Sequence, residues 1–352
     1  MKKIRANTYD ICIGNDALAG VNELIAGNNY SSVFILVDEN TKKHCLKKLS
    51  SLPISYSLIQ IKSREKNKNL RTCEKIWNEL SKKNADRRSL LINLGGGVIS
   101  DLGGFCASTY KRGIDFTNIP TTLLSQVDAS VGGKTGIDFN SYKNQIGTFA
   151  FPKAVFIDAV FLKTLTKREL ASGFAEVIKH GLIADADYWR SVRTKGKDGM
   201  ANEEIISHSV NIKNEIVKAD PFEKGLRKAL NFGHTIGHAI ESASLKTKKP
   251  LLHGEAIASG MICEAYISRK VLGLKDEELD EITSFIVSIF QPSTVKHSTK
   301  SLLAFMKQDK KNNNAEINFT LLRSIGKAEI NNSCSEDLIE ESIKFFNDRC
   351  IH

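Results

Sequence analysis

Short apolar runs that alternate with helical patterns in the first half of the chain most constrain its fold. Three runs have the length and composition of buried strands, at residues 33–37, 90–94 and 154–158. Between them lie stretches with apolar residues at helical spacing, such as residues 70–82. Strands that alternate with helices form parallel sheets with helices on both faces. We therefore predict that the chain begins with an α/β domain.

The sequence pattern changes near residue 165. From residue 167 onward, apolar residues recur at helical spacing and strand signals become rare. Helices are expected over 168–183, 203–219, 233–242, 253–271, 276–290 and 301–306, and a short hairpin strand over 316–322. The 352 residues thus predict two domains, an α/β domain over 1–165 and an α-helical domain over 166–352.

Composition argues against several classes of protein. No stretch approaches the roughly 18 apolar residues that span a bilayer, and the basic N-terminus lacks the apolar run of a signal peptide. The seven cysteines are scattered and never spaced C-x-x-C, which argues against a disulfide framework and a cysteine metal site. These features predict a protein of the reducing cytoplasm with no membrane partner.

The net charge of +10 admits two interpretations. A basic protein binds nucleic acid or attracts a small polyanion. The positive residues are spread along the chain, and no nucleic-acid-binding motif or aromatic interleaving accompanies them. This favours a small anionic substrate over nucleic acid, and a salt-sensitive mobility shift would test for nucleic-acid binding.

Two glycine-rich segments stand out, and the first of them is a candidate diphosphate site. Gly95-Gly96-Gly97 follows a strand and precedes a helix, so its N–H groups suit a diphosphate, although a plain tight turn fits as well. Asp38, after the first strand, suits a ribose hydroxyl or a helix cap. Gly-Gly-Lys-Thr at 132–135 is not a P-loop, because that motif requires glycine where Asp128 stands.

Histidines and one carboxylate gather in three short motifs of the helical half. Glu176 precedes Lys179 and His180 on one helix face, His234 and His238 lie one turn apart, and His253 opens a further helix. Each histidine alone could be an ordinary helix residue. Together, a carboxylate and two imidazoles suit Zn²⁺ with an open coordination position. Spacing alone favours His234 with His238 as the imidazole pair.

Longer motifs identify a family resemblance. The pieces are GGGVISDLGGF, RGIDFTNIPTTLLSQVDASVGGKTGID, KNQIG, RELASGFAEVIKHGLI, EKGLRKALNFGHTIGHAIE and LHGEAIASGM. Together they resemble the 3-dehydroquinate synthase family over at least residues 33–330. The resemblance implies an N-terminal Rossmann-like NAD-binding α/β domain and a C-terminal α-helical metal-binding domain, in an enzyme that uses NAD⁺ and one divalent metal, Zn²⁺ or Co²⁺.

The resemblance also implies a role for individual residues. The metal ligands would be Glu176, His234 and His253, which replaces the pair chosen from spacing. NAD⁺ would contact Asp38, Asn40, Glu65, Lys68, Gly96, Gly97, Val98, Asp101, Thr121, Thr122, Lys134, Lys143, Leu162, Lys163 and Thr164. Catalytic roles would fall to His238, Asn144, Lys179, Lys213, Arg227, Asn231 and Glu223, and substrate would also be bound by Asp128, Lys134, Arg112, Lys310 and Lys311. Arg112 would reach the neighbouring subunit's site, which implies a homodimer.

The implied reaction converts 3-deoxy-D-arabino-heptulosonate 7-phosphate to 3-dehydroquinate, the second step of the shikimate pathway. Two departures bear on nucleotide affinity: Ser100 replaces a glycine common in the family, and Arg64 replaces glycine in the segment before Glu65. Related cyclases, a 2-epi-5-epi-valiolone or 2-deoxy-scyllo-inosose synthase, are the nearest alternatives, although here the substrate-side set is complete. A metal-dependent polyol dehydrogenase of the glycerol dehydrogenase type is a more distant one.

Overall fold

A computed structural model of the protein describes all residues except 51, 53, 141, 246, 308–316 and 351–352. The chain forms two compact units. The first comprises Met1–Thr166 and Ala201–Pro221, and the second comprises Lys167–Met200 and Phe222–His352. None of the described helices is long and apolar enough to cross a membrane.

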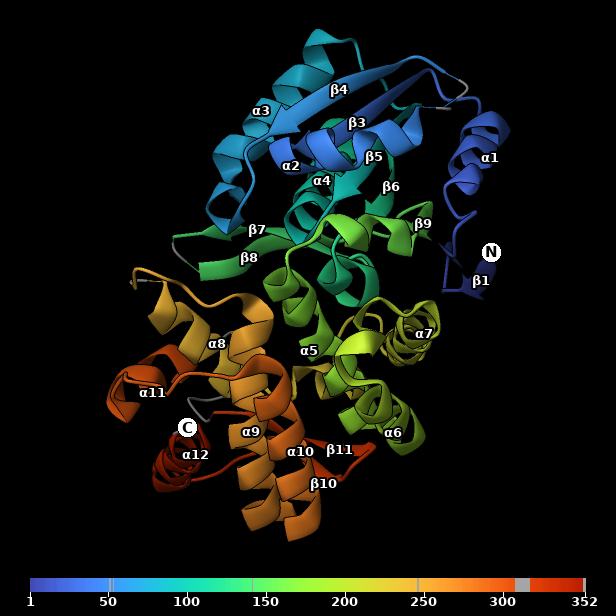
Figure 1. Ribbon diagram of the computed structural model, residues 1–352. Coiled ribbons are helices and arrows are strands. Elements are labelled where there is room, and N and C mark those ends of the chain that lie inside the picture. Colours follow the sequence, from blue (N-terminus) through green and yellow to red (C-terminus); the bar gives the residue numbers. More distant parts are fainter. Residues whose placement is uncertain (51, 53, 141, 246, 308–316, 351–352) are drawn as a thin grey trace. The chain divides into compact units, whose positions relative to one another are not determined.

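The first unit is built on a seven-stranded sheet in the order β1-β2-β9-β6-β5-β3-β4 (Figure 1). Its strands are β1 (Lys2–Arg5), β2 (Asp10–Ile13), β3 (Ser32–Asp38), β4 (Tyr56–Ile61), β5 (Ser89–Gly95), β6 (Asp115–Pro120) and β9 (Ala154–Ile157). All neighbouring pairs are parallel except the antiparallel pair β1–β2 at one edge. The parallel sheet predicted from the three apolar runs is therefore present.

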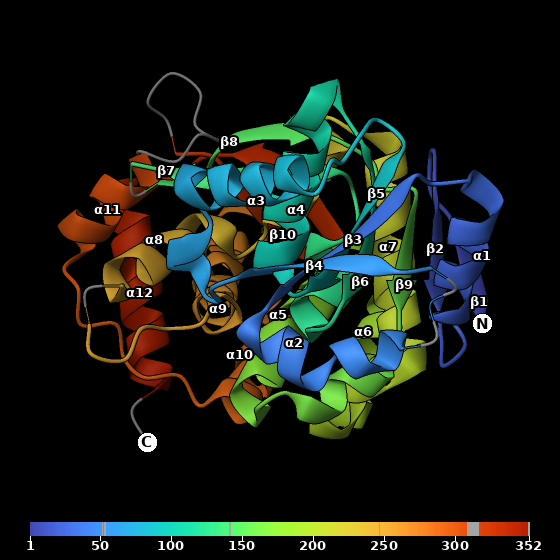
Figure 2. The same cartoon turned by 90° about the horizontal axis from the view of Figure 1, so that it is seen from above.

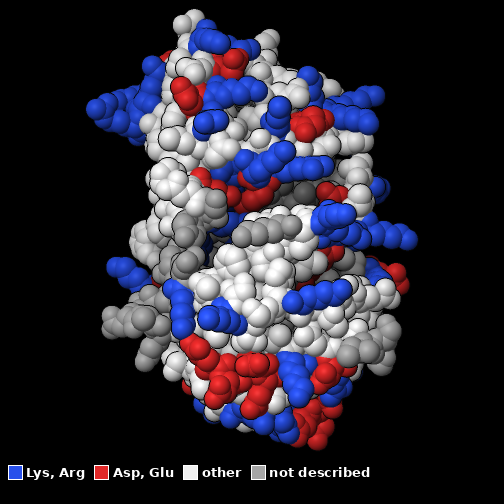
Figure 3. Space-filling view, turned by 90° about the vertical axis from the view of Figure 1, so that its left-hand side faces the viewer, with Lys and Arg blue, Asp and Glu red and all other residues white. Residues whose placement is uncertain are grey.

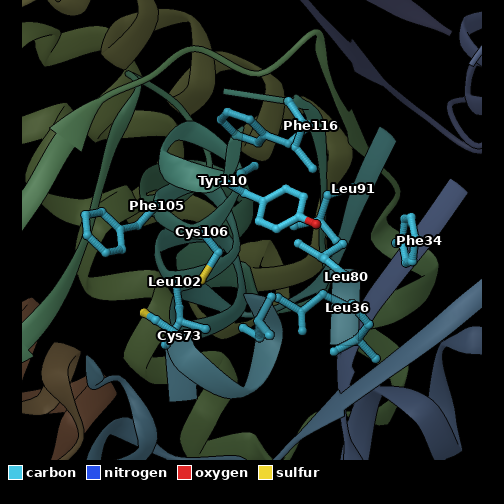
Figure 4. Close-up of a cluster of buried hydrophobic side chains, with 14 of the residues drawn as sticks. Phe34, Leu36, Cys73, Leu80, Leu91, Leu102, Phe105, Cys106, Tyr110 and Phe116 are labelled. Carbon is cyan, nitrogen blue, oxygen red and sulfur yellow. The ribbon is translucent and has the colours of Figure 1, made fainter. Parts of the chain in front are cut away.

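Helices of this unit cover both faces of the sheet. They are α1 (Ala19–Asn28), α2 (Glu39–His44), α3 (Leu70–Lys82), α4 (Gly97–Thr109) and α7 (Glu203–Ala219). Side chains alternate between the two faces along a strand, so Phe34 and Leu36 pack with α3 and α4, whereas Val33 and Ile35 pack with α1 and the segment after α2. Figure 2 shows β3 and β4 between α3 and α2, and Figure 4 shows the core between the sheet and α3 and α4.

A second, two-stranded sheet lies outside the main one. Strands β7 (Lys134–Phe139) and β8 (Tyr142–Phe149) form an antiparallel hairpin, and β7 packs on α4. In both units, short 3₁₀ helices and one π-helical turn join the other elements: η1 (Leu46–Leu49), η2 (Glu65–Asn67), η3 (Tyr110–Arg112), η4 (Ser125–Ala129, the π-helical turn), η5 (Ala159–Thr164), η6 (Gly196–Ala201) and η7 (Leu226–Asn231).

In its described residues, the second unit is helical apart from one β-hairpin. Its helices are α5 (Lys167–Ala184), α6 (Ala186–Lys195), α8 (His234–Ser244), α9 (His253–Leu272), α10 (Asp276–Phe290), α11 (Thr299–Lys307) and α12 (Glu336–Arg349), and its strands are β10 (Phe319–Ser324) and β11 (Lys327–Asn332). Helix α9 packs against α5, α8, α10 and α12 (Figure 1). Its buried side chains occur on all sides, as expected for a central helix.

Helix α7 belongs to the first unit, although the sequence placed it in the helical domain. It packs on η4, and Asn214 donates to the carbonyl of Arg5 in β1 with an N–O distance of 3.1 Å. Apolar periodicity predicts a helix and its buried stripe, but it does not predict which body that stripe packs against. The expected boundary at residue 165 therefore omits the return of the chain at residues 201–221.

Candidate nucleotide and metal sites

The glycine segment and Asp38 lie at the carboxyl ends of two neighbouring strands of the main sheet. Asp38 ends β3, Gly95 ends β5, and these two parallel strands are neighbours. The helix that follows β3 packs on one face of the sheet, whereas the helix that follows β5 packs on the other. The carboxyl ends of such a strand pair form a topological switch point, where open α/β sheets bind ligands.

The three glycines leave little room for side chains. A Cβ atom at Gly95 would lie 2.4 Å from the Ile99 side chain, and one at Gly96 would lie 3.1 Å from Thr122. Helix α4 begins at Gly97, so its first N–H groups face away from the helix body with a positive dipole end. The segment that carries Gly96, Gly97 and Val98 is thus a bare helix N-terminus suited to a diphosphate.

Asp38 is a helix cap in this structure. Its Oδ1 accepts hydrogen bonds from Asn40 N and Thr41 N at 2.9 and 2.8 Å, and Thr41 completes a capping box. Of the two roles considered for Asp38 from the sequence, the helix cap is therefore observed. The second carboxylate oxygen has no part in the two cap bonds, so capping and ribose binding are compatible.

An ion cluster around the buried Lys68 joins four of the remaining nucleotide candidates of this unit. Lys68, which is 3% exposed, lies 2.5 Å from both Asp101 Oδ2 and Asn144 Oδ1. Glu65 Oε1 lies 3.9 Å from the ammonium groups of Lys68 and Lys143. Burial raises the pKa of Asp101, which the Lys68 charge opposes. Burial lowers the pKa of Lys68, but the carboxylates of Asp101, Glu65 and Asp138 together more than offset this, and the pKa is raised.

Other expected contacts of the first unit lie in neighbouring loops. Thr121 follows β6 and donates its N–H to Gly95 O at 3.0 Å, and Thr122 caps the turn that contains Ser125. Lys134 is the exposed first residue of β7. The segment Leu162–Thr164 forms the end of η5.

Asp128 and Lys213 form a close pair. Lys213 Nζ, on α7, donates to both Oδ1 and the backbone carbonyl of Asp128 at 2.6 Å. The Lys213 side chain is almost fully buried. Its charge is thus held at a fixed position beside η4.

Glu176 and Lys179 are buried on α5 and form an ion pair. Two imidazoles approach Glu176 from other helices. Its Oε1 lies 3.6 Å from Nε2 of His234, the first residue of α8, and 3.7 Å from Nε2 of His253, the first residue of α9. One carboxylate oxygen and two imidazole nitrogens therefore converge.

Both imidazoles are held through their other nitrogen. His234 Nδ1 lies 3.1 Å from Phe232 O, and His253 Nδ1 lies 3.2 Å from Glu241 Oε2. Because these oxygens only accept hydrogen bonds, each Nδ1 is the donor, and the lone pair of each ring in its neutral form is on Nε2. Desolvation lowers the pKa of His253, but Glu241 and Glu176 raise it to about 9.

His238 lies in the same group of side chains. Its ring centroid is 5.1 Å from that of His234 and 5.8 Å from that of His253. Ligand atoms of these three histidines lie within 4.8 Å of one another. His234 and His238, the pair chosen from spacing, are thus close in space. His253, which spacing could not find, lies close to both.

The arrangement fits a divalent metal. Glu176 with two imidazoles, which lose a proton when they bind a metal, is a mixed N/O ligand set, and such sets leave an open position in catalytic zinc sites. Metal-binding histidines usually donate their second nitrogen to a carboxylate or a carbonyl, as His253 and His234 do. The negative surroundings that raise the His253 pKa also favour a cation.

Several substrate-side candidates precede α8. Arg227 is 2% exposed in η7, and Asn231 Nδ2 donates to Glu223 Oε1 at 3.3 Å. Glu223 has φ of 59°, a left-handed conformation rare for non-glycine residues. Lys310 and Lys311 lie outside the described residues.

Three residues near the metal candidates were missed from the sequence. Glu241 lies seven positions after His234 on the same helix face, a signal that helical spacing could have supplied. Glu255 accepts Leu252 N at 2.7 Å and pairs with Arg168, which fixes the start of α9. Glu264 of α9 had no local sequence signal, because the N–H groups that it binds, those of Gly233 and Ile236, are at the start of α8.

Comparison with known proteins assigns the family. The family model described as 3-dehydroquinate synthase N-terminal matches residues 58–172, and the C-terminal model matches residues 173–312. The chain belongs to the 3-dehydroquinate synthase family. The 3-dehydroquinate synthase of Parabacteroides distasonis is 42% identical over 345 residues, with 96% of this chain and 98% of the relative covered. That of Pelagibacter ubique is 40% identical over 344 residues, covering 92% and 93%.

Solved structures confirm the fold expected from the 3-dehydroquinate synthase resemblance. A 2-epi-5-epi-valiolone synthase from Streptomyces hygroscopicus, solved with NAD⁺ and Zn²⁺, gives a TM-score of 0.88 at 24% identity over 99% of each chain. A 2-deoxy-scyllo-inosose synthase complexed with carbaglucose-6-phosphate, NAD⁺ and Co²⁺ gives 0.88 at 22%, covering 98% and 99%. A probable glycerol dehydrogenase from Sinorhizobium meliloti gives 0.63 at 12%, covering 97% of each.

Proposed function

We propose that the chain converts 3-deoxy-D-arabino-heptulosonate 7-phosphate to 3-dehydroquinate and phosphate, as a carbon–oxygen lyase of the shikimate pathway. The observation that carries this is similarity to 3-dehydroquinate synthases at about 40% identity over more than nine-tenths of the chain. The convergence of Glu176, His234 and His253 supports it independently.

The residues of both units are compatible with the cofactors of this reaction. Residues at the switch point of the main sheet would hold NAD⁺, which would supply reversible hydride transfer. Glu176, His234 and His253 would hold Zn²⁺ or Co²⁺, which supplies Lewis acidity at the hydroxyl group to be oxidised. The order of steps is oxidation, phosphate elimination, reduction, ring opening and intramolecular aldol closure.

Fixed cations would hold the carboxylate and phosphate of the substrate. Lys213 is oriented by Asp128, and Lys179 is oriented by Glu176, so both ammonium groups have defined positions before substrate arrives. Arg227 is buried, and a guanidinium binds an oxyanion with two parallel hydrogen bonds. Lys134 adds an exposed charge at the start of β7.

The elimination step needs only orientation from the protein. Oxidation to a ketone acidifies the neighbouring C–H group, and the departing phosphate can take that proton itself. We assign orientation of the phosphate to His238 and Asn144. Asn144 is well suited, because Lys68 and the Asp138 carboxylate fix its side chain and backbone, with the Asn144 N to Asp138 Oδ1 distance at 2.9 Å.

Phosphate release from 3-deoxy-D-arabino-heptulosonate 7-phosphate, with catalytic NAD⁺ and Zn²⁺, tests the proposal. Added dehydroquinase converts the product to dehydroshikimate, which absorbs in the ultraviolet. We expect equal amounts of phosphate and dehydroshikimate and no accumulation of NADH. A folded, metal-loaded protein that releases no phosphate from this substrate would refute the proposal.

The related cyclases and dehydrogenases are tested in the same assay. Sedoheptulose 7-phosphate and glucose 6-phosphate are offered in place of the substrate, and turnover of either would indicate another sugar phosphate cyclase. Polyols with excess NAD⁺ are offered last, because a dehydrogenase of the glycerol dehydrogenase type would produce net NADH.

A homodimer is proposed from Arg112 and the β7–β8 hairpin. Arg112 is exposed in a turn where it and Lys111 both have left-handed φ, 68° and 50°. The hairpin exposes Phe139, Ile146 and Phe149 by 46%, 37% and 45%. Exposed apolar side chains grouped on one element are typical of protein interfaces.

Mixing two inactive variants tests the dimer and the role of Arg112 together. If Arg112 serves its partner's site, Arg112→Ala mixed with His253→Ala forms hybrids in which one site has both residues. Activity should then return to the mixture after subunit exchange. A monomer by light scattering, or a mixture as inactive as its parts, would contradict the proposal.

Nucleic acid is the partner we exclude from the proposal. On the face in Figure 3, Lys and Arg side chains are spread out and interspersed with Asp and Glu. A nucleic-acid surface instead gathers positive charge into one patch or stripe. A mobility shift at low salt would test this.

A further inference from the structure

Helix α8 begins without a capping residue of its own. Its N-cap is Gly233, which has no side chain to accept a hydrogen bond, and its third residue is the apolar Ile236. In an ordinary capping box these two positions carry polar side chains that accept each other's N–H. Here both N–H groups are buried, so they require acceptors from elsewhere.

Packing explains why position 233 cannot carry a capping side chain. Gly233 has φ of 78°, and a Cβ there would lie 2.5 Å from Met261 Cγ and 3.0 Å from Ile257 O. Both neighbours are on α9, which crosses α8 closely at this point. Serine or aspartate would force the helices apart.

Glu264 of α9 supplies both acceptors. Its Oε2 lies 2.6 Å from Gly233 N, and its Oε1 lies 3.0 Å from Ile236 N. The side chain is 0% exposed. It lies eleven residues, close to three helical turns, after His253, and therefore on the same face of α9.

A single peptide group connects the hydrogen bond between Glu264 and Gly233 N to His234, a candidate metal ligand. Gly233 N and Phe232 O belong to the same peptide unit, and Phe232 O accepts from His234 Nδ1 at 3.1 Å. A carboxylate on the N–H side of an amide polarises it, which makes the carbonyl oxygen a stronger acceptor. The path is therefore Glu264 carboxylate, peptide 232–233, His234 Nδ1.

We infer that Glu264 is a positioning residue for His234, which acts through the Phe232–Gly233 peptide to fix the Nδ1–H tautomer and direct Nε2 toward Glu176. The inference deepens the metal centre of the proposed function and rests on it. Glu241 acts on His253 directly, with Oε2 at 3.2 Å from His253 Nδ1. Each imidazole of the centre is therefore oriented by one carboxylate, either directly or through a peptide group. Neither carboxylate is itself assigned as a ligand.

Glu264→Gln tests the inference with little change in shape. Glutamine has one acceptor oxygen, so its amide N–H₂ would face one of the two backbone N–H groups. The matched control is Glu278→Gln, because Glu278 of α10 also accepts a backbone N–H from another segment, Ile325 N at 2.9 Å. Zn²⁺ affinity is measured by competition with a chromophoric chelator, beside the Co²⁺ absorption spectrum and thermal unfolding of the metal-free proteins.

We expect Glu264→Gln to weaken Zn²⁺ binding by about 10–100-fold and to alter the Co²⁺ bands. Glu278→Gln should leave both unchanged. If Glu264→Gln lowers the unfolding temperature while its Zn²⁺ affinity stays at the wild-type value, Glu264 is only a helix cap and the inference is overturned.

The tautomer of His234 is measured directly in metal-free wild-type protein. With ¹⁵N-labelled histidine, long-range NMR correlations distinguish Nδ1–H from Nε2–H rings, and His234→Ala identifies the signals. We expect Nδ1–H, and Nε2–H would overturn the inference even if Glu264→Gln does not fold. The tautomer measurement does not depend on the proposed function. A wild-type protein that binds no metal would instead contradict the proposed function.

Discussion

The carbonyl oxygen of Ser172 lies only 1.8 Å from the position that a Cβ atom at Gly254 would take. Ser172 also accepts the Gly254 N–H through its hydroxyl at 3.0 Å. Ser172 is one turn before Glu176 on α5, and Gly254 follows His253 on α9. This backbone contact therefore sets the spacing between the carboxylate and one imidazole of the proposed metal centre.

Gly254→Ala should push α9 away from α5. Overpacking of this kind costs about 1–3 kcal/mol of unfolding free energy, and we expect Zn²⁺ affinity to fall by about tenfold or more as His253 shifts. Chelator competition and urea unfolding measure both effects. Gly27→Ala is the control, since a Cβ there would have nothing within 4 Å. A Gly254→Ala protein with wild-type metal affinity would show that the contact does not set the ligand spacing.

His253→Ala and His238→Ala separate the two possible ligand pairs. We expect His253→Ala to lose its metal and its activity while it remains folded, because one of three protein ligands is gone. His238→Ala should retain metal and lose mainly the elimination rate. Metal content per chain by mass spectrometry measures the difference. Retention by His253→Ala would remove it from the ligand set, and loss by His238→Ala would restore the pair chosen from spacing.

Arg227→Ala should raise KM for the substrate by about 10–100-fold, since a charge-assisted hydrogen bond contributes about 1.5–3 kcal/mol. Steady-state kinetics give KM and kcat separately. Lys228→Ala is the control, because its half-buried side chain bonds Oδ1 of the exposed Asn331 at 3.1 Å. An unchanged KM in the Arg227 variant would assign that arginine a structural role.

Lys68→Met should destabilise the first unit, because it leaves the Asp101 carboxylate buried without its cation. Breaking such a pair costs about 3–5 kcal/mol. The loss should depend on pH. Burial already raises the Asp101 pKa, and removing Lys68 raises it further, so the folded state binds a proton that the unfolded state releases. Stability of the variant then falls as pH rises through this range.

Urea unfolding at pH 5 and pH 8 checks the sign of this effect. Lys68 itself stays charged at both values, since its pKa is raised. The deficit relative to wild type should be smaller at pH 5. Lys75→Met is the control, because Lys75 is exposed and its ammonium donates to the carbonyl of Gln60 at 2.9 Å. A deficit that grows toward acid pH would contradict the account of Asp101.

Elements with strong periodicity were predictable from the sequence. Helix α10 was predicted over the residues it occupies, Asp276–Phe290, and α3 likewise over Leu70–Lys82. The β7–β8 hairpin was not predicted, and the spacing of the Gly-Gly-Lys-Thr run showed only that it is not a P-loop. Most side chains of β8 are exposed, so the alternation that marks a half-buried strand is absent there.

The metal candidates show the limit of reasoning from spacing. Helical periodicity relates residues of one helix, so it found His234 with His238 and could not find His253. That histidine is brought near by the packing of α9 on α5 and α8, through contacts at Gly254 and Gly260. The role of Glu264 was unpredictable for the same reason, because the N–H groups that donate hydrogen bonds to it belong to a different helix.

The return of the chain at residues 201–221 has a consequence for how this protein can be divided. No single cut separates the two units, because the chain passes between them three times. A fragment that ends at Thr166 lacks α7, and with it the ammonium of Lys213 that bonds Asp128. During synthesis, the nucleotide-binding unit is therefore incomplete until the first helices of the other unit have already been made.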